Sequence, residues 1–238
     1  MGVSPWTDAT QAMHGAFAIL AALHHRWKTG EGQYIDAAMI EGSANFLAEL
    51  VMGYTMNGSL GERRGNRDSI MAPHGCYHCK GEDEWVAIAV SSEDEWKAYC
   101  HVIGNPEWTR KEKFGDELSR WQNQDELDKF IDDWTRNYSQ YEIMNMLQKA
   151  GVMAGASLNV RDLVDDPQLK EREFFTEMQH PVMGKLVLAG VPLRLSDTPR
   201  VNNTYPPLLG EHNNYILGEL LGLSGEEITR LVEEKVVY

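Results

Sequence analysis

The most constraining feature of the sequence is an alanine-rich apolar run over residues 8–29, which is followed by Gly30 and Gly32. Its larger apolar residues recur at helical spacing: Met13, Ala16, Phe17, Leu20, Leu23 and Trp27. This period predicts one long helix with a buried face. Asp8 is in a good N-cap position, because its short side chain can accept hydrogen bonds from the free amides of the first turn. The glycines then end the helix.

The remaining sequence predicts a mixed α/β protein in three parts. We expect a short strand at residues 33–37 and a second helix at residues 41–56. The charged loop at residues 62–68 and the polar, proline-containing stretch at residues 196–207 are candidate boundaries. Between them, apolar runs at residues 85–90 and 152–158 alternate with helical patterns. Capping boxes that begin at Ser92, Ser139 and Ser224 predict three helix starts.

The charge balance excludes some classes of partner. The 238 residues include 22 basic and 36 acidic side chains, for a net charge of −14. This argues against nucleic acid or an anionic membrane surface as the main partner. No apolar run is long enough for a membrane span, and the first residues, Met-Gly-Val-Ser-Pro-Trp, do not resemble a signal peptide. Three cysteines fit a reducing compartment, so we expect a cytoplasmic protein.

The segment that contains His74, Cys76, His78 and Cys79 raises the question of a zinc site. A closed structural site needs a second pair of ligands, and Cys100-His101 is a poor candidate. The alternative is a strand whose successive side chains lie on opposite faces. We predict the strand and no metal. A serine hydrolase elbow, a dinucleotide fingerprint and a Walker-type phosphate loop are all missing from the sequence.

Several motifs together resemble one family. The first is Asp-x-x-x-x-Met-His followed by Leu-Ala-Ala-Leu-x-x-Arg-x-Lys-Thr-Gly-x-Gly-Gln, over residues 8–33. Further matches are Asp-Ala-Ala-Met-Ile-Glu-Gly from residue 36, Arg-Gly-Asn from 64, Ala-Pro-His-Gly from 72 and Pro-Leu-Leu-Gly-Glu-His-Asn from 207. Their order and spacing resemble the class III coenzyme A transferases, the CaiB/BaiF family, which includes formyl-CoA transferase and the 2-methylacyl-CoA racemases. The resemblance covers nearly the whole chain.

The resemblance implies a fold and an assembly. It implies an α/β chain that corresponds to the C-terminal half of a CaiB/BaiF-type interlocked fold. Residues 1–64 and 196–238 would belong to a large domain, and residues 65–195 would form a small α/β domain with its connectors. The family's nucleotide-fold half, which carries most contacts to coenzyme A (CoA), has no counterpart in this sequence. We therefore expect an interlocked homodimer, or pairing with a chain that supplies the N-terminal half.

The resemblance also implies a reaction. Asp8 falls at the position of the family's active-site aspartate, and Met39 matches a position that lines the CoA pocket. The expected substrates are an acyl-CoA thioester and a small carboxylic acid, with no metal. Asp8 would form an anhydride with the acyl group and then a thioester with CoA, which divides one difficult transfer into easier steps.

Other interpretations of the same residues remain open. Asp8 can be a simple helix cap, and Met39 can be an ordinary core methionine. In a 2-methylacyl-CoA racemase, the aspartate at this position moves a proton next to the thioester instead of attacking the carbonyl. The chain can also be a truncated, non-catalytic subunit, which would expose a large apolar patch where the other half of the fold belongs.

Overall fold

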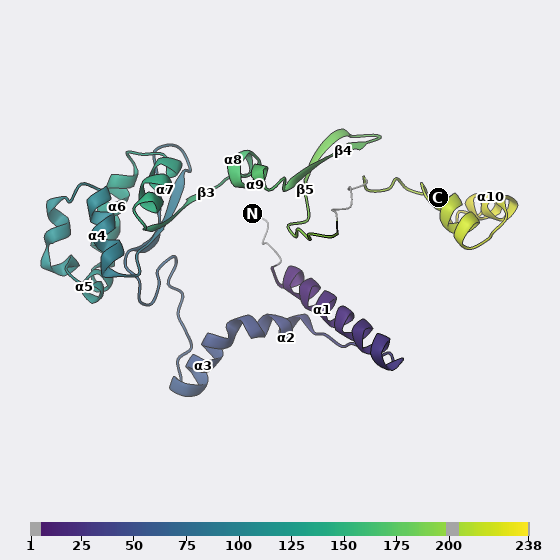
Figure 1. Cartoon of the computed structure of the whole chain (residues 1–238), viewed down its shortest axis with the longest axis horizontal. Coiled ribbons are helices and arrows are strands. Elements are labelled where there is room, and N and C mark those ends of the chain that lie inside the picture. Colours follow the sequence, from purple (N-terminus) through teal and green to yellow (C-terminus); the bar gives the residue numbers. More distant parts are fainter. Residues whose placement is uncertain (1–5, 199–204, 238) are drawn as a thin grey trace. The chain divides into compact units, whose positions relative to one another are not determined.

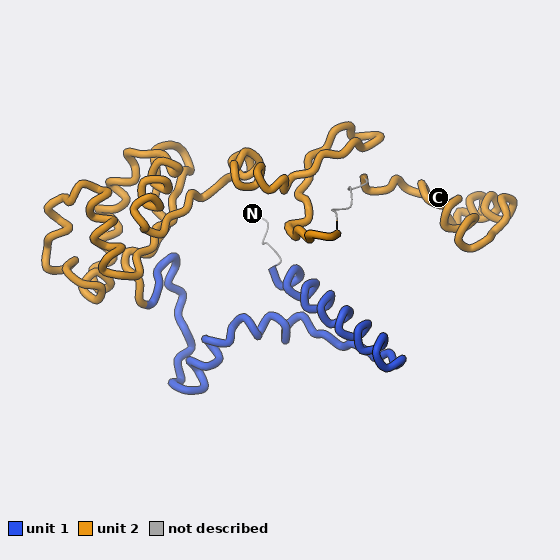
Figure 2. Tube along the Cα trace, in the orientation of Figure 1, with its two compact units in different colours: residues 1–69 blue, residues 70–238 orange. Residues whose placement is uncertain are grey.

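The computed structural model describes residues 6–198 and 205–237 (Figure 1). It confirms the predicted mixed α/β class. The chain divides into two compact units, residues 1–69 and 70–238, which Figure 2 shows in blue and orange. The predicted connection at residues 196–207 lies partly outside the described residues, and so does most of the N-terminal sequence compared above with a signal peptide.

The first unit begins with the long helix α1 (Trp6–Thr29). Its end is as predicted: Gly30 has a φ of 82° and its amide donates to the carbonyl of Arg26 at 2.8 Å. Its beginning differs from the prediction. Trp6 and Thr7 are already helical, so Asp8 lies inside the first turn and is not the N-cap. The aspartate still lies where the positive end of the helix dipole stabilises a negative charge.

The second predicted helix is present but interrupted. It consists of α2 (Met39–Ala44), the 3₁₀ turn η1 (Asn45–Leu47) and α3 (Ala48–Asn57). Gly58 ends it with a φ of 68°. The strand predicted at residues 33–37 is wrong: these residues belong to no strand. Tyr34 and Ile35 have β propensity, but a strand also needs a neighbouring strand, and the first unit contains none among its described residues.

The apolar face of α1 is exposed, although its spacing predicts burial. No described residue of α1 is buried, and Phe17 and Trp27 are 75% and 86% exposed. The same is true of large apolar residues on the following helices, namely Ile40, Phe46, Leu50, Val51, Met52, Tyr54 and Met56. The helical period identifies the side chains that need cover, but no described part of this unit covers them. Such a surface is typical of a protein interface.

The second unit begins with the part of the chain that has a real core. Its antiparallel sheet has the order β1-β2-β3, with Tyr77 opposite Val86 and Val86 opposite Ala156. The helix α6 packs on β1, and α7 packs on β2 and β3. The elements are β1 (His74–His78), β2 (Trp85–Ala89), α4 (Glu93–Val102), η2 (Glu107–Arg110), η3 (Glu112–Phe114), α5 (Glu117–Gln122), α6 (Gln124–Thr135), α7 (Gln140–Lys149) and β3 (Met153–Ser157). The predicted strands and helices of this segment are thus confirmed.

Local hydrogen bonds explain why these helices begin where they do. The hydroxyls of Ser92 and Ser139 accept from the third amide of their helices, as the capping pattern predicts. The helix α6 also holds the end of β1. The carboxylate of Asp132 accepts from the amide of His78 at 3.0 Å, and the hydroxyl of Thr135 donates to the carbonyl of His78 at 2.7 Å.

Arg120, on α5, is the most unusual residue of this core because its side chain is fully buried. Its guanidinium forms an ion pair with Glu93 at 2.7 Å and donates to the carbonyls of Ala72 and Phe114 at 3.2 and 3.3 Å. It also lies 4.7 Å from the ring centre of Trp96. A buried charge is tolerated only with such partners, so Arg120 fixes the chain where it enters β1.

The rest of the second unit contains short helices and a hairpin. These are α8 (Val160–Asp165), α9 (Pro167–Glu171), the hairpin of β4 (Phe175–His180) and β5 (Gly184–Ala189), the π-helix η4 (Asn214–Leu220) and α10 (Gly225–Glu233). Ser224 and Glu227 form a complete capping box, as predicted. At Ser92 only the serine's half forms, because the Glu95 carboxylate accepts from the amide of Ser91 instead. The π geometry of η4 carries no signal in the sequence. Within the described residues, no helix has both the length and the apolar composition to cross a membrane.

The buried ion pair gives a prediction about stability. Replacing Glu93→Ala leaves the guanidinium of Arg120 buried without its counter-charge. We expect the free energy of unfolding to fall by about 2 kcal/mol, as for the loss of a hydrogen bond to a charged group. Asp94→Ala is the matched control, because Asp94 lies in the same helix turn but is 95% exposed in its pair with Lys97. Urea denaturation followed by tryptophan fluorescence measures both. Equal losses in the two variants would contradict this role of Arg120.

Candidate active site

Asp8 is an accessible carboxylate at the positive end of a long helix. It is exposed, and it lies in the first turn of a helix of 24 residues. Among the described residues, its side chain forms no hydrogen bond or ion pair. A capping or structural aspartate is normally held by such bonds. The arrangement leaves both carboxylate oxygens free to approach an electrophile.

The turn that carries Asp8 is joined to the start of α2. The side-chain amide of Gln11 donates to the carbonyl of Ala37 at 2.9 Å. The helices approach closely at Gly42, where an added Cβ would lie 2.6 Å from Oε1 of Gln11 and 3.1 Å from Nδ1 of His14. Only a glycine fits between these two side chains without a shift. The absence of a side chain at this position therefore leaves room for the side chains of Gln11 and His14 in their present positions.

Aromatic rings complete this contact. The ring of Phe46, in the 3₁₀ turn η1, lies 5.7 Å from the ring of Trp6, edge to face, and 6.0 Å from the ring of His14. The imidazole of His14 therefore contacts the η1 segment, although the residue is exposed. Edge-to-face pairs of this kind add about 1 kcal/mol beyond burial. The contact keeps the first two turns of α1, including Asp8, beside the segment that contains Met39.

Met39 is the first residue of α2 and is 44% exposed. It comes two residues after Ala37, whose carbonyl Gln11 holds. The structure therefore brings the two site residues predicted from the sequence into one unit, on neighbouring elements. Because Met39 is not buried, it does not serve as a core methionine among the described residues. A flexible, polarisable side chain at such a place suits contact with an apolar ligand group.

Three of the four histidines and cysteines considered for a zinc site lie on the strand β1. His74, Cys76 and His78 alternate along β1 with residues that face the core, among them Tyr77, and Cys79 follows β1 and is buried. Cys76 and Cys79 therefore differ in exposure and orientation. No group of three or more His, Cys, Asp or Glu side chains in the described part of the chain is placed to hold a metal ion. All three cysteines are free.

The environment of these thiols makes them poor nucleophiles. Burial raises the pKa of Cys79 to about 11, and it raises the pKa of Cys100 to about 11 as well. Burial also raises the pKa of the less enclosed Cys76. Since the thiolate is the reactive form, none of the three is suited to nucleophilic catalysis near neutral pH. Asp8 is the better candidate.

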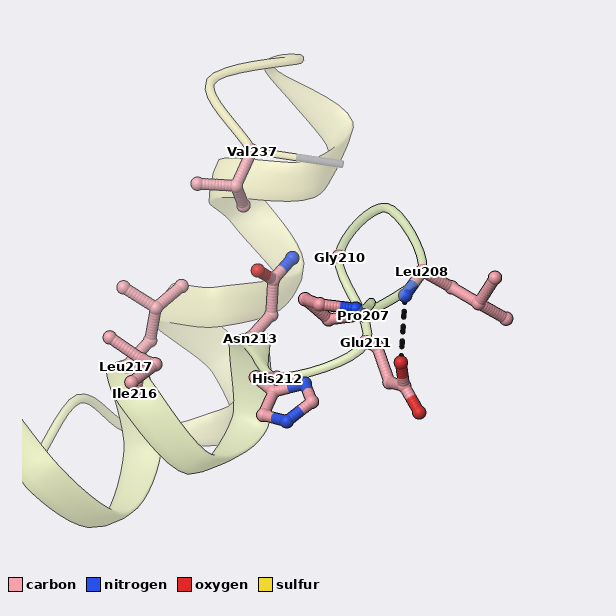
Figure 3. Close-up of a pocket in the computed structure, with 9 residues that line it drawn as sticks. All are labelled: Pro207, Leu208, Gly210, Glu211, His212, Asn213, Ile216, Leu217 and Val237. Carbon is pink, nitrogen blue, oxygen red and sulfur yellow. Dashed lines mark hydrogen bonds between the residues drawn. The ribbon is translucent and has the colours of Figure 1, made fainter. Parts of the chain in front are cut away.

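The second unit contains an open cavity of about 250 Å³ near its C-terminal end (Figure 3). It is lined by Pro207, Leu208, Gly210, Glu211, His212, Asn213, Ile216, Leu217 and Val237. Hydrogen bonds from the Tyr205 hydroxyl and from the Leu208 amide, the latter at 2.7 Å, lower the pKa of Glu211. Both oxygens of this carboxylate are thus used to hold the turn. Neither Asp8 nor Met39 lines this cavity, and we do not assign the reaction to it.

Sequence patterns alone do not reveal the role of Gln11. Its partner Ala37 is 26 residues away, and neither local spacing nor composition predicts this bond. The signal that was available is the run of small residues on α1 together with Gly42, which predicts a close approach of another element.

The chain is similar to known proteins over nearly its whole length. The model of the family described as CoA-transferase family III matches residues 2–213. The succinyl-CoA–L-malate CoA-transferase alpha subunit of Chloroflexus aurantiacus is 32% identical over 237 residues, which are 99% of this chain and 55% of that protein. The succinyl-CoA–D-citramalate CoA-transferase of the same species is 29% identical over 230 residues, which are 97% of this chain and 57% of that protein. The chain thus spans about half the length of these curated relatives.

A solved structure agrees with the sequence matches. The crystal structure of a CAIB/BAIF family protein from Brucella suis superposes with a TM-score of 0.81 at 28% identity. The match covers 92% of this chain and 56% of that one. The similarity extends through most of the chain and supports the predicted fold.

Proposed function

Because the chain belongs to CoA-transferase family III, we propose that it supplies the nucleophile, Asp8, of an acyl-CoA:carboxylate CoA-transferase. The observation that carries the proposal is the state of the Asp8 carboxylate. It is exposed, free of hydrogen bonds and ion pairs to the described residues, and located in the first turn of α1. The neighbouring α2 begins with Met39, the predicted contact to CoA.

The first half of the proposed reaction transfers CoA to the protein. A carboxylate oxygen of Asp8 attacks the thioester carbonyl carbon of the donor, the carbon–sulfur bond breaks, and CoA leaves as its thiolate. The product on the protein is a mixed anhydride. The thiolate then attacks the carbonyl carbon of Asp8. The donor acid departs with one oxygen that belonged to Asp8, and the aspartate becomes a CoA thioester.

The second half reverses these steps with the acceptor acid. The acceptor carboxylate attacks the Asp8 thioester, the thiolate leaves again, and a new anhydride forms. The thiolate attacks the acceptor's carbonyl carbon, and the new acyl-CoA departs. Asp8 is regenerated with one oxygen from the acceptor. No proton is gained or lost overall, so Asp8 needs no acid–base partner for these steps.

The names of the relatives suggest which substrates to try first. Both name succinyl-CoA as the donor, with L-malate or D-citramalate as the acceptor. We propose succinyl-CoA and short dicarboxylic acids as the first substrates for this chain. These molecules share a second carboxylate beyond the reacting one. The selection of that group belongs to parts of the active site other than Asp8.

We further propose that the exposed faces of α1, α2 and α3 are covered by more polypeptide. The chain spans only about half the length of its relatives, and one of them is named an alpha subunit. The cover would be a second copy in an interlocked dimer, or a chain that supplies the half of the fold absent here. The anhydride must also be protected from water, which needs a closed site. The alternative of a non-catalytic subunit predicts that Asp8 is dispensable.

The first prediction concerns the nucleophile. Asp8→Asn should lower the turnover of succinyl-CoA in the assembled enzyme by about a thousandfold or more, because the covalent route is lost. Hydroxylamine added during turnover should convert Asp8 of the unchanged chain to a hydroxamate, which peptide mass spectrometry detects. The variant should give none.

Glu49→Gln provides the control for this experiment, because Glu49 also lies exposed in the first turn of a helix, α3. It should leave turnover unchanged. Solvent exchange at the carbon next to the thioester, without any adduct on Asp8, would favour the racemase reaction. Full turnover by Asp8→Asn would exclude both enzymatic roles.

The second prediction concerns the assembly. Native mass spectrometry of the chain purified from its own host should show it bound to a second polypeptide, either another copy or a different chain in equal amount. Burial of the exposed apolar side chains of α1–α3 provides the driving force. A stable monomer at 27.0 kDa that shows turnover on its own would contradict the proposed pairing.

A further inference from the structure

The side chain of Gln11 is held between two elements of the first unit. On one side, its amide nitrogen donates to the carbonyl of Ala37 at 2.9 Å. On the other side, its amide oxygen lies so close to Gly42 that any Cβ there would be 2.6 Å away. Among the described residues, this is the one side-chain hydrogen bond that joins α1 to residues 32–47.

The position of Gln11 relates this contact to Asp8. Residues three apart on a helix are neighbours on one face, so Gln11 lies next to Asp8 along α1. Its partner Ala37 precedes Ala38, the N-cap of α2, and Met39, the first residue of α2. The hydrogen bond therefore connects the turn that carries the carboxylate directly to the start of the Met39 helix.

We propose that Gln11 is a positioning residue, which fixes the distance between Asp8 and the acyl-CoA bound beside Met39. This inference rests on the proposed function. Gln11 touches neither substrate nor reacting atoms in this role. It acts by preventing the first turns of α1 from sliding along α2. Reactions between held groups are sensitive to such movements, and a shift of about 1 Å can reduce a rate about a hundredfold.

A purely structural role for Gln11 predicts different results. The hydrogen bond is exposed, and such a bond contributes only about 1 kcal/mol to stability. Its loss should therefore change the melting temperature very little. A positioning role instead predicts a fall in kcat with little change in KM for the acyl-CoA, because most of the binding contacts are elsewhere. The two roles are separated by measuring kcat, KM and Tm together.

The test is a double-mutant cycle in the assembled enzyme with succinyl-CoA as the donor. Gln11→Ala removes the bond to Ala37. Gly42→Ala places a Cβ 2.6 Å from Oε1 of Gln11 and so displaces the same side chain. Each should lower kcat, and the single-turnover rate of Asp8 modification, about tenfold. The double variant should also be about tenfold slower, and not a hundredfold, because both changes break one contact.

Thr10→Ala is the matched control. Thr10 is adjacent to Gln11, but its hydroxyl bonds to the carbonyl of Thr7 within α1, at 3.0 Å. It should leave kcat unchanged. Gly42→Ala also creates a close contact that does not involve Gln11, because the added Cβ lies 3.1 Å from Nδ1 of His14. This contact is present in both the single and the double variant. A change in Tm for that variant alone reports this second contact.

Three results would overturn the inference. They are an unchanged kcat for Gln11→Ala, multiplied losses in the double variant, and a fall in kcat that is matched by a large fall in Tm. The yield of the Asp8 hydroxamate from the unchanged chain separates these from a failure of the proposed function. If the unchanged enzyme gives no hydroxamate, the proposed function fails, and the inference fails with it. If the unchanged enzyme gives the hydroxamate and Gln11→Ala has the same kcat as the unchanged enzyme, the inference alone is wrong.

Discussion

The close approach of α1 to α2 at Gly42 is the contact on which the candidate site depends. A side chain at this position would meet Gln11 and His14 and would displace the end of the Gln11 side chain from its present position. Through this contact, Asp8 and Met39 belong to one local structure although they are far apart in sequence. The long helix adds a favourable electrostatic position for the carboxylate, and the hydrogen bond from Gln11 to Ala37 sets the register between the helices.

The exposed apolar faces of the first unit indicate that the site is incomplete in this chain alone. The side chains along α1 repeat with the period of a buried helix face, and yet Met13 is 66% exposed and Phe17 is 75% exposed. The core around Arg120, by contrast, buries its own apolar side chains without any further polypeptide. One chain thus combines a segment that packs by itself with helices that need a partner. The proposed reaction has the same requirement, since an anhydride survives only where water is excluded.

Local signals in the sequence predicted much of the fold. The capping boxes at Ser139 and Ser224 placed two helix starts correctly, because a cap involves only a few neighbouring residues. The strand at residues 33–37 was wrong, because strand propensity says nothing about a pairing partner. Asp8 was misplaced by two residues, since Trp6 and Thr7 join the helix without a distinctive signal. Gln11 was missed because its bond spans 26 residues. The two predicted site residues came from motif resemblance, and their functional roles remain proposals.

The central claim is that Asp8 exchanges oxygen with the acids on which the enzyme acts. One full cycle replaces one carboxylate oxygen of Asp8, because the first half-reaction removes an oxygen with the donor acid and the second returns one from the acceptor. Proton transfer by the same residue replaces none. The most direct measurement incubates the assembled enzyme with succinyl-CoA and succinate that carries a heavy oxygen isotope, and then determines the mass of the peptide that contains Asp8. The account predicts that heavy oxygen accumulates in this carboxylate. Turnover of the labelled acid with no label in Asp8 would contradict it.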